Sequence, residues 1–417
     1  MPSTRRDLLI AGGALAVGGG YLQRRRIARS PDWPSLRRTS SIDIPEIPHA
    51  ERITDDHLEA AIGELDDALD AFESREADPV DQRHDDWPDR SREDRTRGER
   101  ALTETDPTDE ERHEALSAVN ASIRRLQTVI VTIDEERDDV TTEETEARFS
   151  DAEDRAQTFE IDYRGTDPSE AIIHLAAAER DLGRARTRTR PDALAEPMTY
   201  ARGAVYIDIR LRDTERFLEL TDGPSIEDPL LDTLSTMAER IDGDLDATSL
   251  ERDGAATAAY AVYRDLVPRF FDFAEVADGD SPDDPADRLR QACWLRAVST
   301  SFSPLDTVVY PLDTDDDSAL ERVETTPDDL PDAKRAAVDA VEVAAADHPD
   351  DPLATEILRQ ATDLVERGDQ TVDNMRSVIN RAETPFWVRQ TIEAYANYVA
   401  AEHAAEAVED VLAEATW

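Results

Sequence analysis

The sequence predicts an all-α protein, built as one or more multi-helix antiparallel bundles with long amphipathic helices. Apolar residues recur at alternating three- and four-residue spacing over long stretches, which is the period of one helix face. Segments rich in Pro and Asp separate these stretches, and no hairpin signal stands beside the few runs that alternate like strands. The hydrophobic fraction is 39%, much of it alanine, which suits closely packed helices better than a bulky core.

The first strong helix is expected around Leu58–Phe72, where the apolar residues share one face. It should end near Asp78-Pro79. Residues 77–106 then carry mixed charge with almost no apolar periodicity, which predicts a linker or a solvated loop.

A capping box, Thr108-x-x-Glu111, marks the start of the next helix. Behind it, apolar residues keep helical spacing from Leu116 to Val140. The β-branched run at residues 129–131 alone would suggest a strand, but the longer period favours a helix.

A third helix should begin at Asp167-Pro168, with Pro in its first turn, and close in an arginine-rich stretch that ends at Arg190. Residues 192–221 fit either a strand or a helix. Helix is preferred because no partner strand is visible nearby. The remaining helices are expected at 226–243, 251–277 and 283–302, followed by two long antiparallel helices hinged at Thr384-Pro385.

These features predict five segments along the chain. They are a targeting signal or anchor at 1–29, a helix with a charged linker at 30–106, a helical domain at 107–302, a Pro/Asp-rich connector at 303–332 and a helical pair at 333–417.

The N-terminus carries Arg5-Arg6 ahead of an apolar run at residues 8–22 and a basic cluster at residues 24–26. This order resembles a twin-arginine export signal. The run contains five glycines and is shorter than the ~20 residues of a membrane-spanning helix. The resemblance implies export by the twin-arginine translocase to an extracytoplasmic location, either secreted or tethered to the membrane. The alternative is an uncleaved anchor, because the basic residues after the run would hold the body in the cytoplasm.

The net charge is −49, although the first 40 residues carry +6 and Lys334 is the only lysine. Such a composition resembles proteins of salt-adapted archaea. At molar salt the Debye length falls to about 3 Å, so dense surface carboxylates repel one another less. The acidity argues against nucleic acid as a partner, because a phosphate backbone needs clustered basic residues.

One acidic stretch resembles the calcium loop of an EF-hand. Its ligands would be Asp313, Asp315, Asp317 and Glu324, since calcium takes six to eight oxygens. Ser318 stands where such loops usually have Gly. The alternative is a capping box, Ser318-x-x-Glu321, that starts a short helix.

No motif for nucleophilic catalysis is present, and Cys293 is expected to be a small buried residue. Glu110-x-x-His113 matches half of a di-iron motif, but the second half is missing. The arginines between Arg180 and Arg190 suggest either an anion or partner site or, as we prefer, favourable charge at the end of a helix.

The sequence therefore leans away from an enzyme and predicts a cell-envelope protein with a binding or structural role and an unidentified protein or envelope partner. The alternatives are an exported protein that binds calcium or a small ligand and, less favoured, an anchored protein with a cytoplasmic body.

Overall fold

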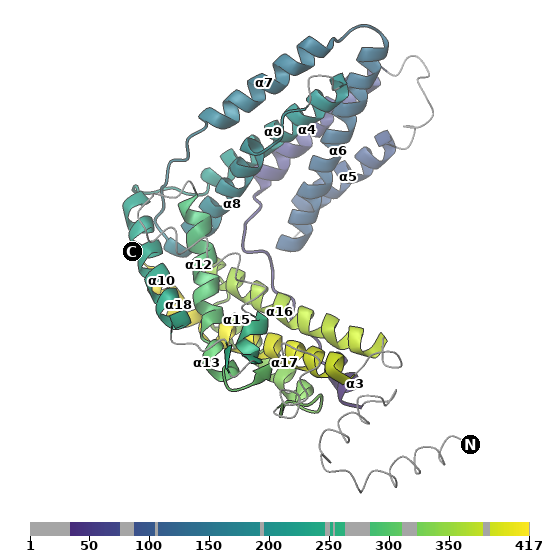
Figure 1. Cartoon of the computed structure of the whole chain (residues 1–417). Coiled ribbons are helices and arrows are strands. Elements are labelled where there is room, and N and C mark those ends of the chain that lie inside the picture. The colour runs from purple at the N-terminus through teal and green to yellow at the C-terminus, as the bar shows by residue number, and fades with distance from the viewer. Residues whose placement is uncertain are drawn as a thin grey trace, which may run out of the picture. The chain divides into compact units, whose positions relative to one another are not determined.

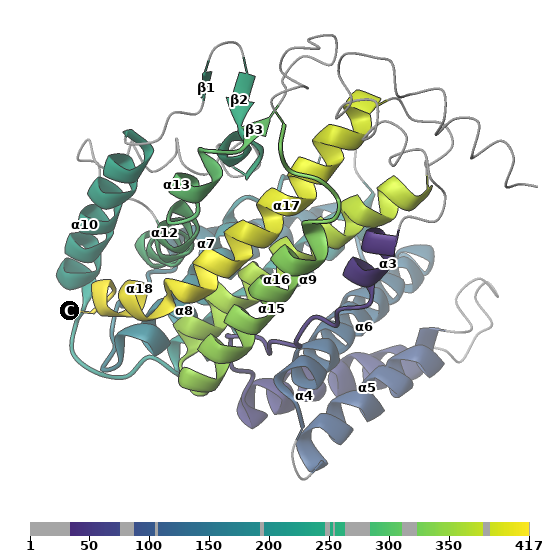
Figure 2. The same cartoon turned by 90° about the horizontal axis from the view of Figure 1, so that it is seen from below.

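A computed structural model describes residues 34–75, 87–104, 107–191, 196–246, 251–252, 255–262, 284–310, 323–377 and 384–416. Figures 1 and 2 show its elements. They form two compact units, each treated by itself below. The N-terminal unit comprises residues 48–232 and 282–290, and the C-terminal unit comprises the chain up to residue 47 with residues 233–281 and 291–416. The predicted all-α class is confirmed by the described residues.

The N-terminal unit is a set of long helices that pack around α6 and α9. The apolar stripe predicted between Leu58 and Phe72 is buried, with Leu58 and Leu65 fully inaccessible. α6 packs against α4, α5 and α9, and α9 packs against α7 and α8. The helices are α4 (Asp55–Glu73), α5 (Trp87–Thr103), α6 (Asp109–Glu136), α7 (Thr142–Thr158), α8 (Pro168–Arg186) and α9 (Pro197–Leu218).

Helix α5 occupies residues that the sequence predicted to be a linker, and this prediction is wrong for 87–103. The helix has few apolar residues: Ala101 is buried in the core of this unit, Trp87 and Leu102 pack against that core, and polar contacts join the helix to its neighbours. Arg95 pairs with Asp66 of α4, and Asp94 accepts a hydrogen bond from Ser122 of α6 at 2.7 Å. Gly98 lies against Ile62, which allows the backbones to approach closely. Apolar periodicity misses a helix that docks in this way.

Most predicted helix starts in this unit are confirmed. Thr108 and Glu111 form the expected capping box of α6, and Asp167 caps α8 with Pro168 in its first turn. The ambiguous segment 192–221 contains helix α9, as preferred.

α6 ends earlier than the predicted Val140, at Glu136. The backbone of Asp138 has a φ of 59°, and the Asp139 amide donates to the Asp134 carbonyl at 2.8 Å. This is the hydrogen bond of a left-handed helix end, and it terminates α6 although the apolar spacing continues.

The C-terminal unit centres on three long helices, α15, α16 and α17, with α3 packed on α15 and α16. Only six residues separate α16 from α17, so these two packed helices run antiparallel. Helix α17 begins at Thr384, where the sequence predicted the hinge between the two helices. The elements are α3 (Pro34–Ser40), α10 (Glu227–Asp246), β1 (Glu251–Arg252), β2 (Ala255–Thr257), α12 (Pro285–Ser299), α13 (Phe302–Leu305), β3 (Val309–Tyr310), α15 (Leu330–Asp347), α16 (Pro352–Ser377), α17 (Thr384–Glu406) and α18 (Val408–Glu414); α10 and α12 begin in residues of the N-terminal unit.

Residues 251–257 were predicted to start a helix, and here the structure differs. Residues 251–252 form β1 and residues 255–257 form β2; these strands pair antiparallel, and β2 pairs with β3 through Ala256 opposite Tyr310. The pairing brings together segments more than fifty residues apart, which local spacing does not reveal. No helix in the described part of the chain has the length and apolar character needed to span a membrane.

Candidate functional site

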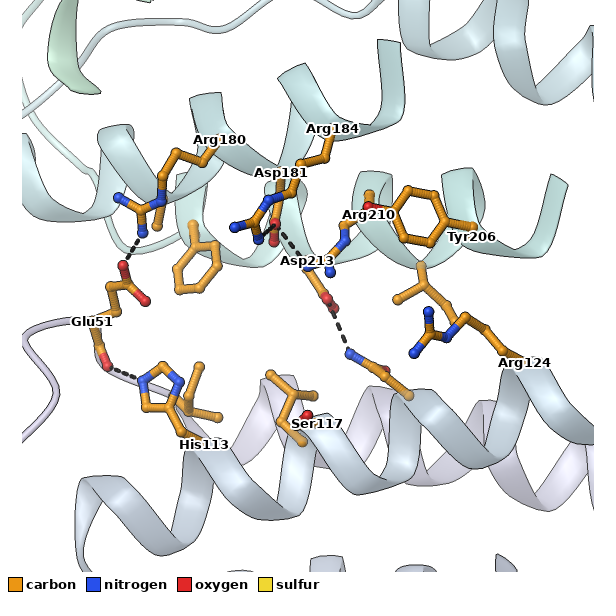
Figure 3. A pocket seen from close by; sticks show the side chains of 16 residues that line it. Glu51, His113, Ser117, Arg124, Arg180, Asp181, Arg184, Tyr206, Arg210 and Asp213 are labelled. Carbon is orange, nitrogen blue, oxygen red and sulfur yellow. Dashed lines mark hydrogen bonds and ion pairs between the residues drawn. The ribbon is translucent and has the colours of Figure 1, made fainter. Parts of the chain in front are cut away.

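A cavity of about 210 Å³ opens within the N-terminal unit where α6 and α8 flank α9 (Figure 3). Each helix turns one face toward it, with residues spaced three and four apart. The lining residues are His113, Leu116, Ser117, Asn120 and Arg124 from α6; Ala177, Arg180, Asp181 and Arg184 from α8; Tyr206, Ile209, Arg210, Asp213 and Phe217 from α9; and Glu51 and Ile53 from the segment before α4.

The lining is basic in a strongly acidic protein. Four arginines and three carboxylates face the cavity, while the chain as a whole carries −49. Figure 3 shows the guanidiniums of Arg124, Arg184 and Arg210 directed into the space between the helices. The balance of charge therefore reverses locally.

Asp181 forms ion pairs with two of these arginines. Its Oδ1 accepts from Arg210 Nη1 at 2.8 Å and from Arg184 Nη1 at 3.4 Å. Asp181 is 7% exposed; burial raises its pKa, and Arg210 opposes that rise. The Nε of Arg210 is buried without a hydrogen-bond partner, so this guanidinium has an unused donor.

Arg124 has no carboxylate within ion-pair distance among the described residues. Its guanidinium carbon lies 5.9 Å from the centroid of the Tyr206 ring, which Arg210 approaches to 5.3 Å and Arg188 to 5.4 Å. Burial lowers the pKa of Arg124, and the positive charge of Arg210 lowers it further. Three arginines from three segments therefore lie near the Tyr206 ring. The ring attracts cations but carries no charge that would neutralise them.

Asp213 forms hydrogen bonds with three other side chains. It is 2% exposed and contacts His57 Nε2 at 3.2 Å, Asn120 Nδ2 at 3.1 Å and Arg212 Nη2 at 2.7 Å. Burial would raise its pKa, but hydrogen bonding from His57 and the charge of Arg212 bring the pKa below its usual value. This carboxylate fixes the amide of Asn120, and its charge also acts on Arg210, although no ion pair joins it to Arg124 or Arg210 among the described residues.

The opposite end of the cavity is less charged. His113 Nε2 donates to the carbonyl oxygen of Glu51 at 2.7 Å, and its ring lies 4.2 Å from that of His49. Burial, with a smaller effect of His49, lowers the pKa of His113 to about 4, so the ring is neutral near pH 7. Arg180 pairs there with the side chain of Glu51 and with Asp287.

The structure separates the arginines that the sequence grouped between Arg180 and Arg190. Arg180 and Arg184 line the cavity, whereas Arg186 donates to the carbonyl of Phe159 at 2.6 Å and Arg190 to Glu146 at 3.0 Å. Sequence reasoning missed Arg124, Tyr206 and Arg210. The available signal was a second, polar face on the α6 segment, spaced three and four apart from His113 to Arg124.

The predicted calcium ligands Asp313, Asp315 and Asp317 lie outside the described residues, as does the N-terminal signal, while Glu324 is exposed. No group of three or more His, Cys, Asp or Glu residues suited to a metal ion occurs in the described ranges. Calcium binding therefore stays a prediction. Cys293 is buried, with its Sγ 3.6 Å from Met237 Sδ.

Comparison with known proteins bears on the C-terminal part of the chain. Residues 227–416 match a family described as Domain of unknown function (DUF8264), which leaves the cavity residues outside the match. No curated protein and no solved structure matches the chain.

Proposed function

We propose that this protein binds a small anionic ligand in the cavity of its N-terminal unit. The observation that carries the proposal is the adjacent pair Arg124 and Arg210. One has no carboxylate partner within the described residues, and the other has a buried, unused Nε donor. Guanidiniums bind carboxylates and phosphates through charge-assisted hydrogen bonds, which are about twice as strong as neutral ones.

The surroundings favour reversible binding of a small molecule. The cavity is small, and the Asp213 network holds Asn120 in a fixed orientation at its wall. Most lining positions lie on rigid helices, which preorganises the donors and lowers the entropic cost of binding. In a protein of charge −49, a pocket with surplus positive charge also distinguishes anions from the acidic surface around it.

The test is calorimetric titration of the full chain, in molar potassium chloride, with small carboxylates, phosphates and sulfate. Arg124→Gln removes one cavity charge, and Arg125→Gln is a matched control from the same turn of α6, outside the lining. We expect saturable binding of at least one anion, weakened about tenfold or more by Arg124→Gln and unchanged by Arg125→Gln. Equal affinities in both variants, or no binding of any anion, would refute the proposal.

We propose further that the body works outside the cytoplasm, exported through the twin-arginine translocase and secreted or tethered by its N-terminus. The support is the order of Arg5-Arg6, the weakly apolar run and the basic residues after it. Cell fractionation tests this with an Arg5→Lys, Arg6→Lys variant beside an Arg25→Lys, Arg26→Lys control. Loss of export only in the first variant is expected; a cytoplasmic body in the unmodified protein would favour the inverted anchor instead.

A further inference from the structure

Building on the proposed function, we infer that the anionic group bound beside Arg124 and Arg210 is a phosphoryl group, as in inorganic phosphate or a small phosphate monoester. The inference rests on how the donors are distributed over the helices and on the local balance of charge.

The donors approach from different sides of the cavity. Arg124 comes from α6, Arg184 from α8 and Arg210 from α9; in Figure 3 the guanidiniums of Arg184 and Arg210 lie on either side of Asp181, and that of Arg124 lies beyond Arg210 on the α6 side of the cavity. A carboxylate is planar, and one guanidinium fork can saturate one of its edges. A phosphoryl group presents three terminal oxygens in a tetrahedral arrangement, so it can accept hydrogen bonds from guanidiniums that do not share a plane.

The charges point to a dianion. At this end, Arg184 and Arg210 share the carboxylate of Asp181, and Arg124 has no carboxylate within ion-pair distance among the described residues; the charge of Asp213, which is hydrogen-bonded to His57 and Arg212, also acts on Arg210. Positive charge is therefore in excess at this end, since three arginines face two carboxylates. A phosphate monoester carries about −1.5 to −2 at pH 7 and can neutralise that excess more fully than a monocarboxylate.

The other end of the cavity suits the uncharged remainder of a phosphate monoester. Leu116, Ile53 and Phe217 supply apolar contact there, and His113 is neutral near pH 7. Because Arg180 is paired with Glu51 and Asp287, this end has no comparable surplus of charge. A ligand would lie with its phosphoryl group toward Arg124 and its organic part toward Leu116.

The experiment compares inorganic phosphate, glycerol 3-phosphate, succinate and acetate by calorimetry on the full chain in molar potassium chloride. We expect the phosphoryl ligands to bind at least about tenfold more tightly than acetate and succinate. Tighter binding of glycerol 3-phosphate than of phosphate would identify monoesters as the ligand, and the reverse would identify free phosphate; both support the inference.

Three further measurements separate ligand binding from structural effects. The affinity for glycerol 3-phosphate should rise between pH 5 and 7, as the second proton of the monoester, with its pKa near 6, is lost, while succinate at fixed charge shows no such rise above its own pKa values. Asp181→Asn removes the carboxylate that competes for Arg210 and should tighten phosphate binding severalfold, a gain that misfolding cannot produce. Arg124→Gln should weaken it about tenfold.

Binding of succinate or acetate without binding of the phosphoryl ligands would overturn the inference and leave the proposed anion site standing. The absence of binding by every anion would overturn both. Weaker phosphate binding by Asp181→Asn, in a variant with an unchanged melting temperature, would also contradict the inference.

Discussion

The carboxylate of Glu179 on α8 accepts a hydrogen bond from the backbone amide of Asp287 at 2.6 Å and so caps the first turn of α12. The amide of Ala286 and the hydroxyl of Tyr163 also donate to it, at 3.1 and 2.8 Å. Burial raises the pKa of Glu179 to about 8, although these hydrogen bonds favour the charged form. One side chain therefore links the pH of the solution to the start of another helix.

This relationship predicts how stability depends on pH. The pKa of Glu179 is about 8 in the folded protein, higher than the ordinary value of 4.5. Between pH 4.5 and 8 the folded state therefore binds more protons at this residue than the unfolded state does. Glu179 thus lowers the free energy of unfolding as pH rises from about 4.5 to 8, by up to about 1.4 kcal/mol per pH unit. Glu179→Gln should flatten that slope in denaturant titrations at several pH values. Glu219→Gln, at an exposed carboxylate, should keep it, and an identical slope in all three proteins would contradict the assignment.

The only lysine of the chain lies in the C-terminal unit, 1% exposed, with Nζ 2.6 Å from Asp369 Oδ2. Tyr398 donates to the other oxygen of Asp369 at 2.7 Å. We expect Lys334→Met to lower the free energy of unfolding by about 3 kcal/mol, because it leaves Asp369 without its cation. Adding Asp369→Asn should restore part of the loss, which a double-mutant cycle measures. Arg335→Gln, at the exposed neighbouring residue, serves as the control; additive effects at 334 and 369 would argue against coupling.

Two helical glycines should respond oppositely to alanine. A Cβ on Gly203 of α9 would lie 2.6 Å from the ring of Phe149, whereas a Cβ on Gly183 of α8 would meet no heavy atom within 4 Å. Gly203→Ala should therefore destabilise the protein by about 1–3 kcal/mol through overpacking. Gly183→Ala should stabilise it by up to about 1 kcal/mol, because alanine is the better helix former. Thermal unfolding of the two variants checks both signs, and a shift in the same direction for both would contradict the packing.

The excess of acidic residues predicts a requirement for salt. With a net charge of −49, repulsion between carboxylates grows when screening is removed, and the far-ultraviolet circular dichroism should lose helical signal on dialysis into low salt. Sodium chloride should restore the signal, and sucrose at equal osmolality should restore less of it. A spectrum unchanged by dialysis would show that the ion pairs between helices suffice without screening.

The helices were predictable from the sequence where local signals determine them. The apolar stripe of α4 and the capping box that starts α6 are both readable from residues a few positions apart. Helix α5 was not, because its stability depends on partners in other helices, such as Asp66 for Arg95. Strand β2 was missed partly for the same reason, since Ala256 pairs with Tyr310, although its pairing with β1 is local.

The cavity could not be predicted from the sequence. Arg124 and Arg210 are 86 positions apart, and nothing near either residue indicates that they approach the same tyrosine ring. A single arginine on a helix usually faces solvent or a nearby carboxylate. Only the packing of α6 against α9 shows that Arg124 has no acidic partner in the described part of the chain, in a protein with twice as many acidic as basic residues.

Cys293 offers a practical consequence of the fold. Its thiol is fully buried against Met237 in the C-terminal unit, and the sequence has no other cysteine. A thiol-reactive dye can therefore label the protein only when the surroundings of Cys293 open, so the labelling rate reports the free energy of that opening. Comparing the labelling rate with and without an anion would show whether ligand binding in the cavity stabilises the C-terminal unit, which contributes no residue to the cavity.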